Sequence, residues 1–219
     1  MKERPIIFND EMVRAILDGR KTQTRRVIKP QPPECTENGT PYTGWQKTTL
    51  PCKEGFDITA FIDNPKYIGE CPHGKPGDRL WVREMWSGDY CYQKEPPSQR
   101  VSVMTPDGPM LRESIWYWAD GQPEYGDWER PRPSIHMPRW ASRITLEITN
   151  VRVERVKDIS EEDAVAEGVH GEREALAAGM SWYDKPRRAF RSLWQSIYGT
   201  NSWSDNPWVW VIEFRRVEG

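Results

Sequence analysis

The sequence lacks any apolar run that approaches the roughly 20 residues needed to span a bilayer as a helix. Its first ten residues, MKERPIIFND, also lack the apolar stretch of a secretory signal. Both absences argue against an integral membrane or secreted protein. We therefore expect a cytoplasmic protein with no membrane partner.

An excess of charge of one sign is also missing. The chain carries 31 basic and 33 acidic residues, for a formal net charge of -2. A protein that binds long nucleic acid through its overall charge would be strongly basic. Any contact with RNA is therefore expected to be local.

Cysteine is scarce, with four residues in 219. All four, Cys35, Cys52, Cys71 and Cys91, lie within one quarter of the chain, and no C-x-x-C pair occurs. A cytosolic setting argues against disulfides. Cys71 and His73 could join two other cysteines around zinc, but the spacings match no standard zinc pattern. Free thiols are the favoured interpretation, and we expect no metal and no cofactor.

Large aromatic side chains compensate for a hydrophobic fraction of only 37%, because 12 Trp, 8 Tyr and 5 Phe supply apolar area for a core. Near the start, Asn9 stands in an N-cap position before an amphipathic helix that ends at Gly19. The following RKTQTRRVI alternates as a strand does.

Further elements are indicated along the chain. RLWVRE and IWYWAD have the composition of strands, and RITLEITNVRVERVKDI reads as two strands joined near Thr149 and Asn150. Ser160 is expected to cap a short helix that ends at Gly168, with Asp163 in the capping-box position. A helix over 186–198 and the strand WVWVIEFRRV complete the order.

This order predicts an α+β fold around a mostly antiparallel β-barrel, because pairing of the strand-like PIIF near the start with the last strand would remove exposed edges. The length fits a single domain over residues 1–219. Loop-rich insertions are expected at about 29–75 and 87–140, where periodicity is weak.

The segment GRKTQTRR concentrates lysine, threonine and arginine directly after the first helix. A solvated basic strand is one interpretation. If Lys21 is desolvated, its lowered pKa would let it take a proton from a hydroxyl. Glu167 gives an independent hint, because a carboxylate in the last helical turn is disfavoured by the helix dipole.

Several segments together resemble the ASCH domain, a family of the PUA-like class. The matching segments are GRKTQTRR, GDRLWVRE, SRITLEITNVRVERV, ISEEDAVAEG and WVWVIEF. The longer layout, with IHMPRWASRI and LWQSIYG, is similar to ASCH proteins of tailed phages and prophages. The resemblance covers about residues 5–28, 76–86 and 140–217 and leaves the insertions unmatched.

One branch of that family, a bacterial amidohydrolase that deacetylates acetylated cytidine, is built around a Lys, a Thr and a Glu. The resemblance implies that Lys21, Thr24 and Glu167 are the catalytic residues here, and that Arg26 matches the family arginine. This chain is about twice as long as that enzyme. Other ASCH proteins bind or cleave RNA, so the fold alone does not decide the activity.

Further candidates for substrate contact lie outside this triad. Trp86 could stack on a base, although alternate apolar residues of a strand are more often core. Glu84 could read an amino edge of a base or pair with an arginine. His136 and Arg139 lie between Pro133 and Pro138, which fits a rigid recognition loop.

Three functions follow from these observations. The leading hypothesis is an amidohydrolase acting on a modified nucleoside, with Thr24 as nucleophile, Lys21 as base and Glu167 as proton shuttle. The alternative is binding or cleavage of single-stranded RNA, with Lys21, Arg25 and Arg26 on phosphates. The third is a phage accessory module that binds a host partner without chemistry.

Overall fold

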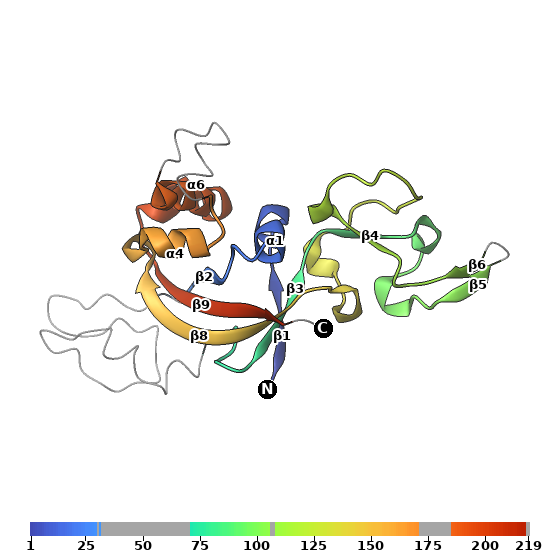
Figure 1. Ribbon diagram of the computed structural model, residues 1–219, viewed down its shortest axis with the longest axis horizontal. Coiled ribbons are helices and arrows are strands. Elements are labelled where there is room, and N and C mark those ends of the chain that lie inside the picture. The colour runs from blue at the N-terminus through green and yellow to red at the C-terminus, as the bar shows by residue number, and fades with distance from the viewer. Residues whose placement is uncertain (30, 32–70, 106–107, 171–184, 218–219) are drawn as a thin grey trace, which may run out of the picture. The chain divides into compact units, whose positions relative to one another are not determined.

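The computed structural model describes residues 1–29, 31, 71–105, 108–170 and 185–217 (Figure 1). Its main sheet has five strands and is mixed, and a small number of helices accompany it. In sheet order the strands are β1 (Glu3–Ile7), β3 (Arg79–Arg83), β8 (Thr145–Arg155), β9 (Trp208–Val217) and β2 (Gln23–Val27). The predicted α+β class is therefore confirmed.

The predicted closure of a barrel through its first and last strands is wrong for the described part of the chain. β1 pairs with β3, and the pairing is parallel, as in Ile6 opposite Val82. β9 has β8 and β2 as its neighbours, and β2 runs antiparallel to it with Thr24 opposite Ile212. The last strand thus pairs with the strand after the first helix, whereas β1 stands at the other end of the sheet order.

The chain divides into two compact units. The first contains Met1–Gly19, Gly77–Glu147 and Arg215–Gly219, and the second contains Arg20–Pro76 and Ile148–Phe214. A single domain over 1–219 stays a prediction, and most of the expected insertion at 29–75 lies outside the described residues.

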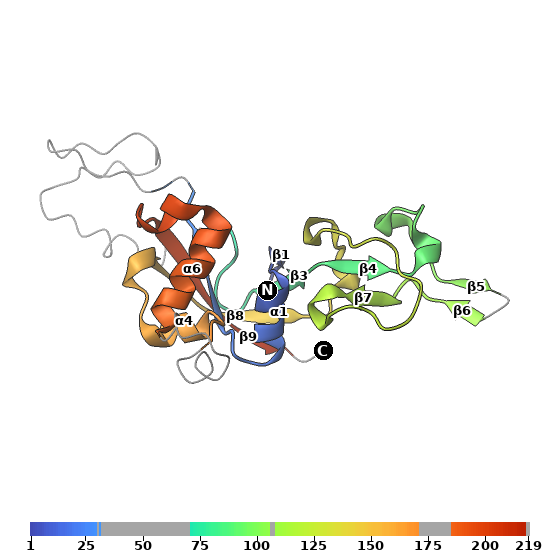
Figure 2. The same ribbon diagram turned by 90° about the horizontal axis from the view of Figure 1, so that it is seen from above.

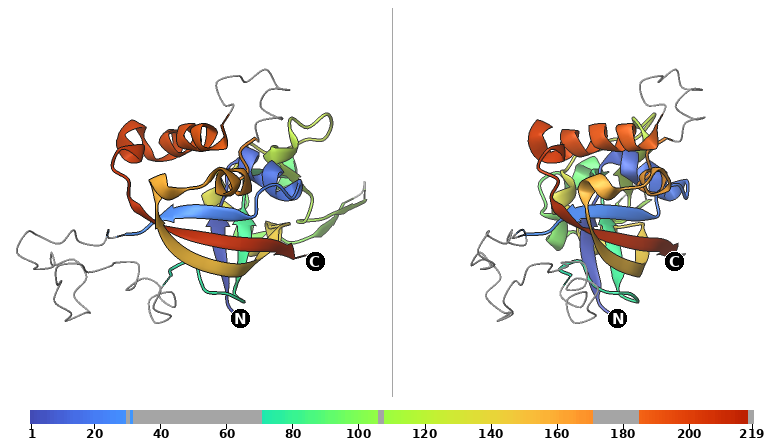
Figure 3. Two further views of the ribbon diagram at one scale, coloured as in Figure 1. Left: turned by 60° about the vertical axis from the view of Figure 1, so that its left-hand side comes forward. Right: turned by 90° about the vertical axis from the view of Figure 1, so that its left-hand side faces the viewer.

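In the second unit, helices α4 (Glu161–Ala166) and α6 (Pro186–Tyr198) cover one face of β2, β9 and β8 (Figure 3). The shared core consists of Val156, Ile159, Ala164, Val169, Phe190, Trp194, Val209 and Val211. Ser160 caps α4 as predicted, because its hydroxyl accepts the N–H of Asp163 at 3.0 Å. Gly168 has a φ of +91°, which suits the predicted end of this helix.

The long strand β8 corrects another prediction, because residues 145–155 form one strand and not two joined by a turn. Leu146 and Ile148 are buried, Thr149 and Asn150 are both exposed, and Val151 is buried again. The alternation of burial therefore shifts by one residue without interrupting the strand. Two successive exposed residues resemble a turn in the sequence.

In the first unit, α1 (Asp10–Leu17) has the predicted cap, since Asn9 accepts the N–H of Met12 at 2.9 Å. The segment expected to be a loop-rich insertion at 87–140 contains two small antiparallel pairs of strands (Figure 2). They are β4 (Trp86–Gly88) with β7 (Ile115–Tyr117), and β5 (Val103–Thr105) with β6 (Gly108–Met110). Short 3-10 helices connect them, so this segment is ordered although its periodicity is weak.

A buried ion pair joins parts of the first unit. Both terminal nitrogens of Arg100 donate to Glu129, at 2.6 and 2.8 Å, and both side chains are almost fully buried. Gly88 lies beside them, and a Cβ there would be 2.3 Å from Nη1 of Arg100, so a larger residue would displace this guanidinium.

We predict that Glu129→Ala lowers the free energy of unfolding by about 3 to 5 kcal/mol, because it leaves the Arg100 guanidinium buried and unpaired. Urea denaturation measures this loss. Glu113→Ala is the matched control, since Glu113 forms a solvent-exposed pair with Arg112. Its effect should be much smaller, because solvent screens an exposed pair, and equal losses in both variants would contradict the prediction.

In the part of the chain that the structure describes, no helix is long and apolar enough to cross a membrane.

Candidate functional site

Lys21 lies in the short connection before β2, which runs along the end of α4. The N–H of Thr22 donates to the carbonyl of Ala166 at 2.8 Å, and the Arg20 guanidinium donates to the carbonyl of Gly168 at 3.0 Å. These bonds on both sides of Lys21 fix the connection against residues 144 and 148 positions later in the chain. The local fold therefore brings Lys21 to Glu167, which is the C-cap residue of α4.

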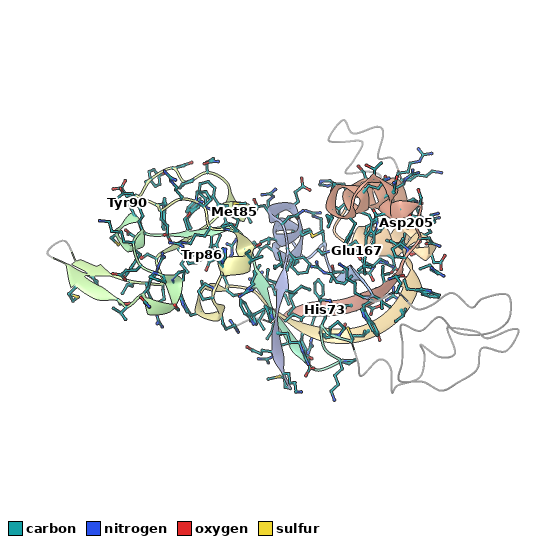
Figure 4. All side chains as sticks on the ribbon, turned by 180° about the vertical axis from the view of Figure 1, so that it is seen from behind. His73, Met85, Trp86, Tyr90, Glu167 and Asp205 are labelled. Carbon is teal, nitrogen blue, oxygen red and sulfur yellow. The ribbon has the colours of Figure 1, made fainter. Side chains whose placement is uncertain are left out.

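The two side chains form a buried ion pair. Nζ of Lys21 donates to Oε2 of Glu167 at 2.9 Å and to the carbonyl oxygen of the same residue at 2.7 Å. Each residue is only 2% exposed. Figure 4 shows Glu167 on the side of the helices that faces the strands. Two of the three residues of the predicted triad are thus in direct contact.

Burial lowers the pKa of the Lys21 ammonium, because the charged form loses its hydration. The Glu167 carboxylate acts in the opposite direction through its charge and its hydrogen bond, and the nearby charges of Arg26 and Arg25 lower the pKa further. Desolvation is the largest of these effects. Lys21 therefore has the lowered pKa that is expected of a lysine acting as a base.

Arg25 adds a second cation to this site and is itself surrounded by carboxylates. Its Nη1 donates to Oε1 of Glu167 at 3.2 Å. Its Nη2 donates to Asp163 at 2.8 Å and to Glu154 at 2.9 Å. Because the side chain is buried and its terminal nitrogens contact three carboxylates, direct contact between Arg25 and a substrate is not favoured.

The network continues through residues that the sequence analysis did not assign to the site. Arg152 on β8 donates to Glu154 and Asp163 and contacts Glu213 on β9. The Gln23 amide donates to the backbone carbonyl of Asp163 at 2.7 Å. The two-residue spacing of Arg152 and Glu154 on a strand was a signal that they share a face.

Asp163 does not complete the predicted capping box. Its carboxylate accepts hydrogen bonds from Arg25 and Arg152, and these interactions lower its pKa despite partial burial. The first turn of α4 therefore contributes to the site and not only to its own cap.

The strand period separates Thr24 from the charged network. Arg25 pairs with Val211, which belongs to the core beneath the helices, whereas Thr24 pairs with Ile212. Since successive strand residues point to opposite faces, Thr24 lies on the face away from α4, together with Arg26. Thr24 is buried within three residues of Lys21, but β2 directs it to the other side of the sheet.

The remaining predicted contacts belong to the first unit. Glu84 is fully buried and accepts two hydrogen bonds from Arg143, at 3.0 and 2.9 Å. Burial raises the pKa of Glu84, and Arg143 opposes this shift. Of the two interpretations of Glu84, contact with a base or pairing with an arginine, the structure contains the pairing with Arg143.

Trp86 and the two loop residues have different environments. Trp86 is 0% exposed and packs with Met137 and Ala141 (Figure 4), so the structure does not favour base stacking on it. His136 is exposed in a short 3-10 helix. Arg139 is exposed and donates to Glu3 at 3.0 Å. Substrate contact by His136 and Arg139 stays a prediction.

No group of three or more His, Cys, Asp or Glu residues suited to a metal ion occurs among the described residues. Cys71 is buried, and His73 lies near it in the chain. A zinc site with Cys71 and His73 would need two other cysteines, and Cys35 and Cys52 lie outside the described residues.

Comparisons with protein-family profiles, with curated proteins and with solved structures gave no significant match to this chain.

Proposed function

We propose that the protein is an amidohydrolase of the PUA-like ASCH type that removes an acyl group from a modified nucleoside, with acetylated cytidine as the first candidate. The buried contact between Lys21 and Glu167 carries this proposal. A lysine whose pKa is lowered by burial can accept a proton, and a neighbouring carboxylate can receive or return it. The resemblance to the deacetylating branch of the family supplies the substrate class.

In the proposed reaction, Thr24 attacks the acyl carbonyl, neutral Lys21 takes the hydroxyl proton, and Glu167 assists transfer of a proton to the departing amine as the C–N bond breaks. Water then hydrolyses the acyl ester of Thr24, which releases the carboxylic acid and restores the hydroxyl. Thr24 lies on the opposite face of β2 from the core beneath the helices, so its role is tested separately from that of Lys21.

We expect Thr24→Ala to lower kcat by about 100-fold or more and Thr24→Ser to retain most of it, because serine keeps the attacking hydroxyl. Deacetylation of acetylated cytidine, followed by chromatography, measures both. Thr22→Ala is the control, because Thr22 is an exposed threonine two residues before Thr24 and should leave kcat unchanged. If Thr24→Ala turned over like the unchanged protein, a water molecule would replace Thr24 as the proposed nucleophile.

RNA binding is the alternative, and the burial of Lys21 and Arg25 makes them poor phosphate contacts. We expect affinity for acetylated cytidine to be nearly independent of salt, because a free nucleoside carries no phosphate. Three phosphate contacts to single-stranded RNA would instead give a slope of about -2 in log affinity against log salt. Such a slope, lost in an Arg25→Gln, Arg26→Gln variant, would favour RNA binding. Absence of any product or binding would favour the accessory module.

A further inference from the structure

The Glu167 carboxylate has two cationic partners, one on each oxygen. Oε2 accepts from Nζ of Lys21 at 2.9 Å, and Oε1 accepts from Nη1 of Arg25 at 3.2 Å. All three side chains are at most 3% exposed. The carboxylate is therefore clamped between an amine and a guanidinium away from water.

The two cations behave differently as pH changes. Lysine can release its proton when it is buried, whereas arginine stays charged at any working pH. If Lys21 were the sole partner, its deprotonation would leave Glu167 as an uncompensated buried charge, which is strongly unfavourable. Arg25 provides a partner that remains when Lys21 is neutral.

Arg25 is itself fixed from a second side. Its Nη2 donates to Asp163 and Glu154, and these two carboxylates are held by Arg152. The Nε–H of Arg25 has no partner among the described residues. The guanidinium is therefore placed by its terminal nitrogens, one of which is committed to Glu167.

We propose that Arg25 is a positioning residue, which holds the Glu167 carboxylate in place whether or not Lys21 carries its proton. This inference rests on the proposed function, in which Lys21 is the base. It gives Arg25 a role through Glu167 and not through contact with the substrate.

The charged groups that act on Lys21 include Glu167 from the end of α4 and Arg25 and Arg26 from β2. Removal of Arg25 would take away a like charge and leave Glu167 to Lys21 alone. Both changes favour the protonated amine. An Arg25→Gln variant should therefore hold the proton of Lys21 up to a higher pH.

The test is an NMR titration of the full chain labelled with 13C and 15N in lysine, in which Lys21 is identified by the signal lost in Lys21→Arg. We expect Arg25→Gln to raise the titration midpoint of Lys21 by about one to three pH units. Arg152→Gln is the matched control, because Arg152 binds Asp163 and Glu154 and no contact with Glu167 is seen for it among the described residues. Its midpoint should stay close to that of the unchanged protein.

An unchanged midpoint in Arg25→Gln, or an equal rise in Arg152→Gln, would overturn the proposal. If Arg25→Gln failed to fold, solvent exchange of the Arg25 Nη1 protons in the unchanged protein would decide. These protons should stay protected throughout the titration of Lys21, because Nη1 remains bound to Glu167, and a loss of protection as Lys21 becomes neutral would refute the role of Arg25.

The titration uses no substrate, so it separates this inference from the proposed function. The expected midpoints without deacetylation would support Arg25 as the holder of Glu167 while rejecting the amidohydrolase. Deacetylation with an unchanged midpoint in Arg25→Gln would do the reverse.

Discussion

Lys21→Arg is expected to lower the turnover of acetylated cytidine by about 100- to 10,000-fold, the range over which a general base contributes. Arginine keeps the positive charge opposite Glu167 but cannot release its proton to act as a base. Lys21→Met, which lacks both charge and base, should show a loss at least as large. Kinetics of product formation, with circular dichroism to confirm the fold, measure the effect.

Lys29→Arg is the control, because Lys29 is exposed beyond the end of β2. It should leave turnover unchanged. Activity near that of the unchanged protein in Lys21→Arg would reject Lys21 as the base.

The same hypothesis predicts the direction in which kcat changes with pH. The active form of Lys21 is the neutral amine, so kcat should rise with pH as the ammonium loses its proton. Since burial lowers the pKa of Lys21, this rise should occur below the usual range of lysine. A rise confined to that usual range would contradict a desolvated base.

Elements defined by local hydrogen bonds could be predicted from the sequence. Asn9 and Ser160 each cap a helix through a backbone N–H three residues later, so the signal lies within a few positions. The continuous β8 could not be predicted, because a shift of alternation at Thr149 and Asn150 resembles a turn in one dimension. The position of β1 beside β3 depends on pairing between residues about 76 positions apart, as in Glu3 with Arg79.

The candidate site was predictable to a similar extent. Lys21 and Glu167 were expected to meet because of the family resemblance, and they are in contact. The carboxylates around Arg25 were not expected, since Glu154 and Asp163 come from different elements that converge only in the folded chain. Their convergence changes the interpretation of Arg25 from a phosphate contact to a part of the buried charge network.

In a buried charge network, removal of one partner strongly destabilises the folded protein. Glu167→Ala is expected to lower the free energy of unfolding by about 3 to 5 kcal/mol, because it leaves Lys21 without its carboxylate partner in a buried site. Arg25 keeps its ion pairs with Asp163 and Glu154, so the destabilisation comes mainly from the unpaired charge of Lys21. Urea denaturation at neutral pH, monitored by tryptophan fluorescence, measures it.

The destabilisation of Glu167→Ala should shrink as pH rises, which a simple loss of packing would not do. With its carboxylate removed, the pKa of Lys21 in the folded variant lies further below that of the unfolded chain. Between these two pKa values the unfolded chain binds more protons, so the variant gains stability relative to the unchanged protein as pH increases. Glu162→Ala, at an exposed position of the same helix, should change stability by no more than about 0.5 kcal/mol at any pH. A loss for Glu167→Ala that is small, or constant from neutral to alkaline pH, would show that Glu167 does not compensate a titrating charge on Lys21.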